Sequence, residues 1–186
     1  YYNKPSQKGL YQHFKEVASA TNKPIVLYNV PGRTSVNMTA QTTLELAADC
    51  KNVVAVKEAS GNMVQIMDII RSKEDSFQVI SGDDALTLPL IAAGATGVIS
   101  VVSNSYPKAF SDVVHLSLQG KFEKAREIHN ALLPFIAAIF EDGNPAGVKM
   151  AMHQMSLCTS TVRLPLVQVN KGTAQKILSL VAELKM

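Results

Sequence analysis

Four short, nearly continuous runs of apolar and β-branched residues limit what this chain can fold into more than any other feature of its sequence. The runs cover residues 24–30, 52–58, 77–81 and 96–102. Strands that are buried on both faces have this composition, and such strands occur mainly in parallel sheets. The segments between the runs carry apolar residues at helical spacing, which is typical of amphipathic helices. The alternation predicts an α/β chain built from βα units with a parallel sheet.

After the fourth run the chain is expected to continue without strands. Residues 107–119, 121–140, 145–157 and 172–184 have the pattern of helices. This organisation fits two architectures. One is a small doubly wound sheet, and the other is half of a (β/α)8 barrel, which normally takes about 250 residues against the 186 of this chain. The pattern of runs alone does not choose between them.

Composition and charge exclude several classes of protein. The chain is 47% hydrophobic and 18% charged with scattered Lys and Arg residues, so we expect neither a disordered chain nor a nucleic-acid partner. No apolar run reaches the ~18 residues of a membrane-spanning helix, so no membrane partner is expected. Two cysteines, Cys50 and Cys158, are too few for a disulfide framework, which favours a cytoplasmic setting. The chain begins without Met, and we expect it to start inside a longer protein.

A lysine stands at the end of the second apolar run, and the active sites of parallel α/β folds lie at the carboxyl ends of the strands. Lys57 directly follows residues 53–56, so the strand places its stem among apolar neighbours. Such surroundings disfavour the ammonium and leave a share of neutral amine that can attack a carbonyl group. The alternative is a lysine that extends into solvent or pairs with Glu58, and for Lys57 taken by itself this alternative is the simpler one.

Other polar residues follow the ends of the first and third runs. Tyr28 ends the first run and can pass a proton, and Arg33 in the loop behind it can hold a carboxylate with two hydrogen bonds. The alternative is a strand-end aromatic residue followed by a solvated loop charge. Asp83 and Asp84 after the third run are better explained as helix caps than as metal ligands. The histidines share no ligand spacing, so no metal is expected.

Five segments in a fixed order carry a resemblance to a known family. They are residues 1–7 (YYNKPSQ), 27–34 (LYNVPGRT), 56–62 (VKEASGN), 81–84 (SGDD) and 97–101 (GVISV). Together they resemble the dihydrodipicolinate synthase (4-hydroxy-tetrahydrodipicolinate synthase) family, in the superfamily of pyruvate-dependent class I aldolases with N-acetylneuraminate lyase. The resemblance implies the later half of a TIM (β/α)8 barrel in residues 1–119, from the end of strand 4 to strand 8, and a C-terminal α-helical domain in residues 120–186.

The resemblance also implies a catalytic centre around Lys57. Lys57 would form a Schiff base with the keto carbon of pyruvate and turn the methyl group into an enamine nucleophile. Tyr28 would shuttle protons during imine formation and condensation. Tyr2 would match the second tyrosine of this proton relay, which in the family reaches into the active site of a neighbouring subunit.

Substrate binding and cellular role follow from the same resemblance. Arg33 would hold the carboxylate of L-aspartate 4-semialdehyde, and backbone groups of Gly82 and Ile99 would line the pyruvate pocket. The reaction would serve lysine and diaminopimelate biosynthesis in the cytoplasm, with no metal or organic cofactor. Family members are usually homotetramers built as a dimer of dimers.

The first part of the family's barrel has no counterpart in this sequence. A Gly-Thr-Thr-Gly-Glu segment that binds the pyruvate carboxylate is missing, and of the lysine-feedback site only Tyr1 would be present. Three alternatives stay open. They are a related aldolase or lyase acting on N-acetylneuraminate or 2-keto-3-deoxy sugar acids, a truncated inactive chain that folds differently or assembles with copies of itself, and an unrelated α/β binding module. Arg33 in its Val-Pro-Gly-Arg-Thr segment favours the synthase over the sialic-acid lyases.

Overall fold

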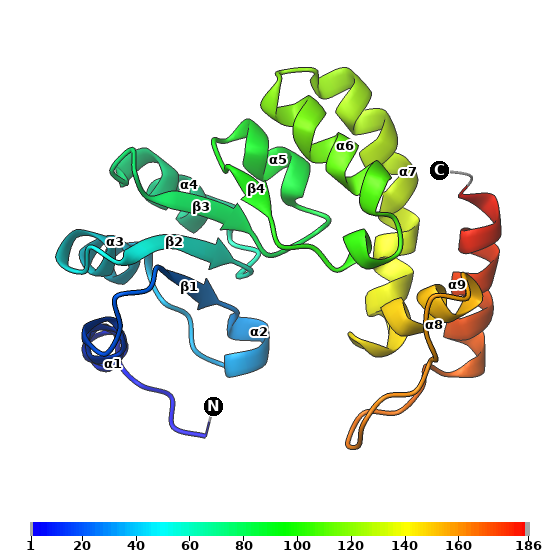
Figure 1. The fold of residues 1–186 in the computed structure, drawn as a ribbon, viewed down its shortest axis with the longest axis horizontal. Helices are drawn as coiled ribbons and strands as arrows, with labels where there is room; N and C mark the ends of the chain where they lie inside the picture. Colours follow the sequence, from blue (N-terminus) through cyan, green and yellow to red (C-terminus); the bar gives the residue numbers. More distant parts are fainter. Residues whose placement is uncertain (1, 185–186) are drawn as a thin grey trace. The chain divides into compact units, whose positions relative to one another are not determined.

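The computed structural model describes residues 2–184, and their contacts divide the chain into two compact units between Ile99 and Ser100. The first unit holds a sheet of four parallel strands in the order β1-β2-β3-β4 (Figure 1). The strands are β1 Ile25–Asn29, β2 Val53–Glu58, β3 Gln78–Ser81 and β4 Gly97–Val98. The prediction of an α/β chain with a parallel sheet is confirmed.

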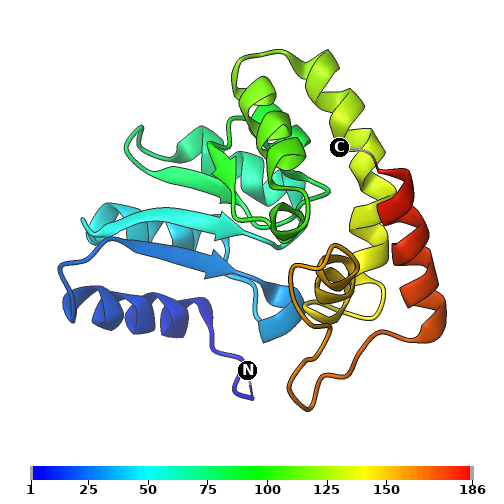
Figure 2. The same cartoon turned by 45° about the vertical axis from the view of Figure 1, so that its right-hand side comes forward.

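The order of the strands distinguishes the two architectures that the sequence left open. Each strand pairs with the strand that follows it in the chain, and the order never reverses. A doubly wound sheet has a reversal point and helices on both faces. Here α1 Gln7–Ser19, α3 Ala40–Asp49 and α4 Met63–Ser72 cover the same face of the sheet (Figures 1 and 2). This is the winding of a (β/α)8 barrel.

The helices bury one face of the sheet, which we call the outer face. Leu27, Val56 and Val79 on this face are at most 1% exposed and belong to one core with residues of the helices, among them Leu46 and Ile66. Each side chain of this size contributes about 1.5–3 kcal/mol when it is buried. The outer face is therefore the main source of hydrophobic stabilisation in the first unit.

The opposite face, which we call the inner face, is only partly buried. Val26 is 44% exposed, Tyr28 is 45% exposed and Ile99, just after β4, is 50% exposed. Ala55, the partner of Val26 on the next strand, is 2% exposed. The prediction that the strands are buried on both faces is therefore wrong for β1, whose inner side chains are exposed.

The helix after β3 begins later than the sequence predicts. It is α5 Thr87–Ala92, whereas we expected a start at Ala85. Asp83 Oδ1 accepts the N–H groups of Ala85 and Leu86 at 2.9 and 3.3 Å. Asp83 thus caps this segment as predicted, but the residues that it caps form a turn in front of the helix.

The fourth strand ends earlier than the apolar run that predicts it. β4 stops at Val98, and Val102–Asn104 form the short 3-10 helix η1. Ser100 Oγ accepts the N–H of Ser103 at 2.9 Å. A local side-chain bond of this kind offers the backbone an alternative to the sheet.

The second unit is helical. It contains α6 Pro107–Leu118, α7 Phe122–Phe140, α8 Ala146–Gln154 and α9 Lys171–Glu183. α7 packs against the other three helices, and its Leu132, Phe135 and Ile139 are fully buried. A Cβ atom on Gly147 of α8 would lie 2.0 Å from the carbonyl oxygen of Ile139, so only glycine allows this approach.

The two units do not coincide with the expected domains of residues 1–119 and 120–186. α6 packs against α7 and belongs to the second unit, whereas the resemblance assigns it to the barrel. The expected domains stay a prediction. Among the described residues, no helix has both the length and the apolar character needed to span a bilayer.

Candidate active site

The carboxyl ends of β1 and β2 bring Tyr28 and Lys57 together on the inner face. The two residues are partners in the parallel register, and Ile80 of β3 is the partner of Lys57 on the other side. Residues in register point to the same face because side chains alternate along each strand. Lys57 Nζ lies 4.2 Å from the centre of the Tyr28 ring. An ammonium over an aromatic face is attracted by about 0.5–1 kcal/mol at an exposed site.

Lys57 does not pair with Glu58, although the two are neighbours in the chain. Glu58 points to the outer face and is 0% exposed, while Lys57 is half-buried on the inner face. Among the described residues, Lys57 Nζ forms no ion pair. The alternative that pairs Lys57 with Glu58 is therefore wrong. Because no carboxylate among the described residues holds it, the Lys57 amine is available to a carbonyl substrate at the strand ends.

Gly82 approaches Lys57 from the end of β3. Its N–H donates to the carbonyl oxygen of Glu58 at 2.7 Å. A Cβ atom on Gly82 would lie 3.1 Å from Lys57 Cε and 2.8 Å from Ala59 Cβ. The missing side chain thus leaves the space that the lysine stem occupies.

The structure places the remaining predicted residues less closely to Lys57. Ile99 directly follows β4, and its N–H donates to the carbonyl oxygen of Ser81 at 3.0 Å. Arg33 lies exposed in α2 Pro31–Thr34, the short helix after β1. Tyr2 is 88% exposed. Within the described part of the chain, nothing holds the Arg33 or Tyr2 side chain against Lys57, and Tyr1 lies outside that part.

A buried polar cluster behind Lys57 was not predicted from the sequence. Glu58 Oε1 accepts from Asn29 Nδ2 at 2.8 Å, and Glu58 Oε2 accepts from Ser60 Oγ at 2.7 Å. Asn29 and Glu58 are partners in the register, one position beyond Tyr28 and Lys57. The alternation of side chains could have indicated that Glu58 turns away from Lys57. Its partners, one at the end of β1 and one just after β2, carry no sequence signal that links them to Glu58.

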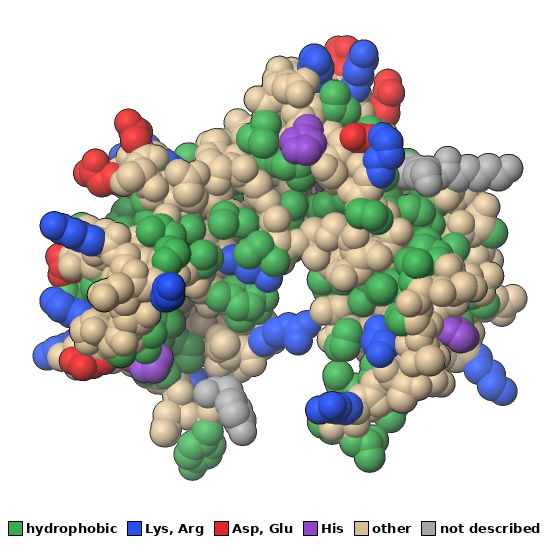
Figure 3. Space-filling view, viewed as in Figure 1, with side chains coloured by type: hydrophobic (Ala, Val, Ile, Leu, Met, Phe, Trp, Pro, Cys, Tyr) green, Lys and Arg blue, Asp and Glu red, His purple; other side chains and the backbone are tan. Residues whose placement is uncertain are grey.

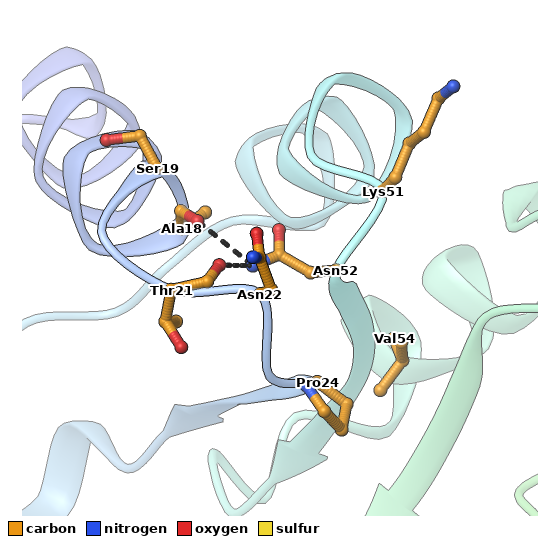
Figure 4. A pocket seen from close by; sticks show the side chains of 8 residues that line it. All are labelled: Ala18, Ser19, Thr21, Asn22, Pro24, Lys51, Asn52 and Val54. Atoms are coloured by element: carbon orange, nitrogen blue, oxygen red, sulfur yellow. Dashed lines mark hydrogen bonds between the residues drawn. The ribbon is translucent and has the colours of Figure 1, made fainter.

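A hollow of about 530 Å³ lies at the opposite end of the strands. Figure 4 shows Asn52, just before β2, with its Nδ2 at 3.0 and 2.9 Å from the backbone oxygens of Ala18 and Thr21. Lys51 extends away from Asn52 in the same view. This end corresponds to the amino-terminal side of a barrel, where residues serve stability rather than chemistry.

Two observations bear on what this site could bind. The described residues contain no group of three or more His, Cys, Asp and Glu side chains that suits a metal ion. On the face drawn in Figure 3, acidic and basic side chains lie together at the top and at the left of the view, while basic side chains at its lower centre and lower right stand without acidic neighbours. The chemistry available at this site is that of an amine, a phenol and backbone groups.

Known proteins are similar to this chain both in sequence and in fold. The profile of the Dihydrodipicolinate synthetase family matches residues 1–184. A 4-hydroxy-tetrahydrodipicolinate synthase of Phocaeicola vulgatus is 55% identical over 185 residues, which are 100% of this chain and 62% of the relative. A relative of the same name in Parabacteroides distasonis is 53% identical over 99% of this chain and 62% of its own length.

A solved structure gives the same result for the fold. The crystal structure of a dihydrodipicolinate synthase from Thermotoga maritima has a TM-score of 0.96 and 42% sequence identity, over 98% of this chain and 63% of that one. The four parallel strands and the helices between them are thus part of the TIM-barrel fold of these proteins. The chain spans about three fifths of the length of the proteins that it matches.

Proposed function

This chain belongs to the Dihydrodipicolinate synthetase family, and from this premise we propose that it forms part of a 4-hydroxy-tetrahydrodipicolinate synthase. Such an enzyme is a lyase that condenses pyruvate with L-aspartate 4-semialdehyde. The observation that carries the proposal is the placement of Lys57. Its half-buried amine stands at the carboxyl end of a parallel strand, beside a tyrosine and without an ion pair among the described residues.

In the proposed reaction, the neutral amine of Lys57 attacks the keto carbon of pyruvate. A C–N bond forms, the keto oxygen leaves as water, and the product is an imine. Loss of a methyl proton turns the imine into an enamine, whose terminal carbon then attacks the aldehyde carbon of the second substrate. The new C–C bond is formed while the substrate is still bound to Lys57.

Tyr28 and Tyr2 are the proposed proton carriers. The ring of Tyr28 lies 4.2 Å from Lys57 Nζ, which supports a role for its phenol in the proton transfers. Tyr2 is 88% exposed, which leaves its phenol available to a neighbouring subunit. A homotetramer built as a dimer of dimers is the assembly that we propose for the complete protein.

The substrates are held by Arg33 and by the backbone at the strand ends. Arg33 is exposed and forms no ion pair with the described residues, so its guanidinium is available to the semialdehyde carboxylate. The N–H groups of Gly82 and Ile99 are already used within the sheet. These two residues would therefore shape the pyruvate pocket with their carbonyl groups and Cα atoms. The proposed reaction takes place in the cytoplasm and uses no cofactor.

Trapping of the imine tests the proposal. The chain is incubated with pyruvate and reduced with borohydride, and the modified residue is mapped by mass spectrometry. We expect an adduct on Lys57 and none on Lys51, an exposed lysine of the same chain. Lys57→Ala should abolish the adduct. A folded chain that gives no adduct on Lys57 would contradict the proposal and favour an inactive chain.

A second step separates the synthase from related aldolases, which form the same adduct with pyruvate. L-aspartate 4-semialdehyde added before the borohydride should consume the enamine, so that less pyruvate adduct is found on Lys57. If N-acetylneuraminate or a 2-keto-3-deoxy sugar acid loads Lys57 instead and the semialdehyde has no effect, the proposed second substrate is wrong.

A further inference from the structure

Glu58 has all of its hydrogen-bonding capacity satisfied inside the protein. The carboxyl group is 0% exposed. Oε1 accepts from Asn29 Nδ2 at 2.8 Å and from Gln65 Nε2 at 3.3 Å. Oε2 accepts from the Ser60 hydroxyl at 2.7 Å and the Ser60 N–H at 3.3 Å. Four donors on two oxygens suit an ionised carboxylate, which only accepts, and they offset the cost of its burial.

The partners of Glu58 also hold the end of the loop that carries Arg33. Asn29 Oδ1 accepts the N–H of Met38 at 3.0 Å. Gln65 Nε2 donates to the carbonyl oxygen of Met38 at 3.2 Å. Asn37 Nδ2 donates to Gln65 Oε1 at 2.8 Å, and Asn29 Nδ2 donates to Asn37 Oδ1 at 2.9 Å. The N–H and the carbonyl group of Met38 are thus held by two side chains, Asn29 and Gln65, that both bind Glu58.

Glu58 is at the same time connected to the catalytic strand ends. It directly follows Lys57, and its register partner Asn29 directly follows Tyr28. Its carbonyl oxygen accepts the N–H of Gly82 at 2.7 Å. The residue therefore joins the ends of β1, β2 and β3 on the outer face, immediately behind the pair on the inner face.

We propose that Glu58 is a positioning residue, whose buried carboxylate fixes the Arg33 loop relative to Lys57 through Asn29 and Gln65. This inference rests on the proposed function, in which Lys57 holds the first substrate and Arg33 holds the second. Lys57 lies on β2, whereas Arg33 lies in the loop after β1. The distance between the two residues therefore depends on the contacts that join β2 to the end of this loop. Glu58 makes this connection without touching either substrate.

Glu58→Gln tests the proposal, since it keeps the size of the side chain and replaces one acceptor oxygen with a donor. The matched control is Glu45→Gln on α3, because Glu45 is exposed and, among the described residues, accepts from Gln41 alone. In amide hydrogen exchange, the Met38 N–H should lose protection in Glu58→Gln and keep it in the control. The Thr39 N–H, which Gln7 Oε1 accepts at 3.1 Å, should change less.

Kinetics distinguish positioning from a general loss of stability. Glu58→Gln should lower kcat/KM for L-aspartate 4-semialdehyde by about tenfold or more. The rate at which pyruvate forms its adduct on Lys57 should fall much less. In an Arg33→Ala background this loss should disappear, because there the loop has nothing left to position. A loss of the same size in both backgrounds, or equal losses for both substrates, would overturn the proposal.

Two further arms keep the test decisive. Gln65→Ala removes one of the two connections and should give the same pattern at a smaller size if Glu58→Gln does not fold. If the unmodified chain forms no pyruvate adduct, the proposed function fails and the exchange experiment still decides the structural role. An unchanged Met38 N–H in both variants would then refute the positioning by Glu58.

Discussion

At the scale of single residues, the candidate site depends on one side chain that is missing. Gly82 has a backbone that any residue can adopt, since its φ is not in the left-handed region. Glycine is required because the side chain of Lys57 passes close to the position that a Cβ atom of residue 82 would occupy. Interiors of proteins are close-packed, so even one added methyl group has to displace its neighbours.

Gly82→Ala should therefore slow the chemistry of Lys57 more than it harms the fold. The new Cβ would lie 3.1 Å from Lys57 Cε and 2.8 Å from Ala59 Cβ, so the lysine stem has to move. We expect the rate of borohydride-trapped adduct formation with pyruvate to fall by about tenfold or more, because a small misplacement of a nucleophile is costly. Gly97→Ala is the control, since nothing lies within 4 Å of its Cβ position. Equal rates in the two variants would show that Gly82 does not shape the site.

At the scale of elements, the second unit is held together where α6 meets α7. Tyr106 occupies the N-cap position of α6 and packs edge-on against Phe135 of α7, with ring centres 5.1 Å apart. Its side chain is buried, and its hydroxyl has no hydrogen-bond partner among the described residues. Burial raises the pKa of Tyr106 above the usual value of 10.0.

The raised pKa gives this contact a pH dependence with a definite sign. The folded chain keeps the Tyr106 proton to a higher pH than the unfolded chain does. The stability associated with this group is complete below pH 10.0 and is lost as the pH rises through the folded-state pKa. Tyr106→Phe should remove part of this alkaline loss.

The same variant should not destabilise the protein at neutral pH. Removal of an unpaired buried hydroxyl is expected to leave the free energy of unfolding unchanged or to raise it by up to about 1 kcal/mol, so the urea midpoint should stay the same or rise. Tyr11→Phe should instead lower the free energy of unfolding, because the Tyr11 hydroxyl donates to Asp49 and accepts from Lys15 and the variant loses both bonds. A clear drop in the midpoint of Tyr106→Phe at neutral pH would contradict this account.

The elements show where a sequence pattern is sufficient and where it fails. The apolar runs predicted all four strands, because apolar and β-branched residues are typical of buried strands. The strand ends predicted Tyr28 and Lys57 at one edge, whereas Gly82 followed from the resemblance. The pattern overestimated β4, where Ser100 binds its own neighbour instead of extending the strand. It also missed the partners of Glu58, because the contact of Gln65 on α4 with Glu58 on β2 depends on how the short connection between the two elements turns.

At the scale of the whole molecule, the main open feature is the inner face of the sheet. Val26, Tyr28 and Ile99 on this face are each at least 44% exposed. Large apolar side chains left exposed on one face of a sheet often mark a contact with other protein or a tendency to aggregate. The chain in isolation should therefore behave differently from a protein with a closed core.

We expect the isolated chain to bind the dye ANS and to self-associate with rising concentration. Val26→Lys places a charge on the inner face and should lower both signals, as measured by fluorescence and analytical ultracentrifugation. Val64→Lys is the control, because Val64 is 74% exposed on α4 and lies outside this face. If Val64→Lys lowers the signals as much as Val26→Lys does, the inner face is not their source.

The unreversed order of the strands has a further consequence, which concerns how the sheet forms. β1 pairs with β2, β2 with β3 and β3 with β4, so every pairing joins strands that are neighbours in the chain, from 17 residues apart (Ile80 and Gly97) to 29 (Tyr28 and Lys57). Each parallel pairing must first close the loop and helix between its two strands, and no pairing has to wait for a strand further along the chain. The sheet can therefore grow one βα unit at a time, in the order in which a ribosome releases the strands. Lys57 would find Tyr28 already in place when its own strand docks.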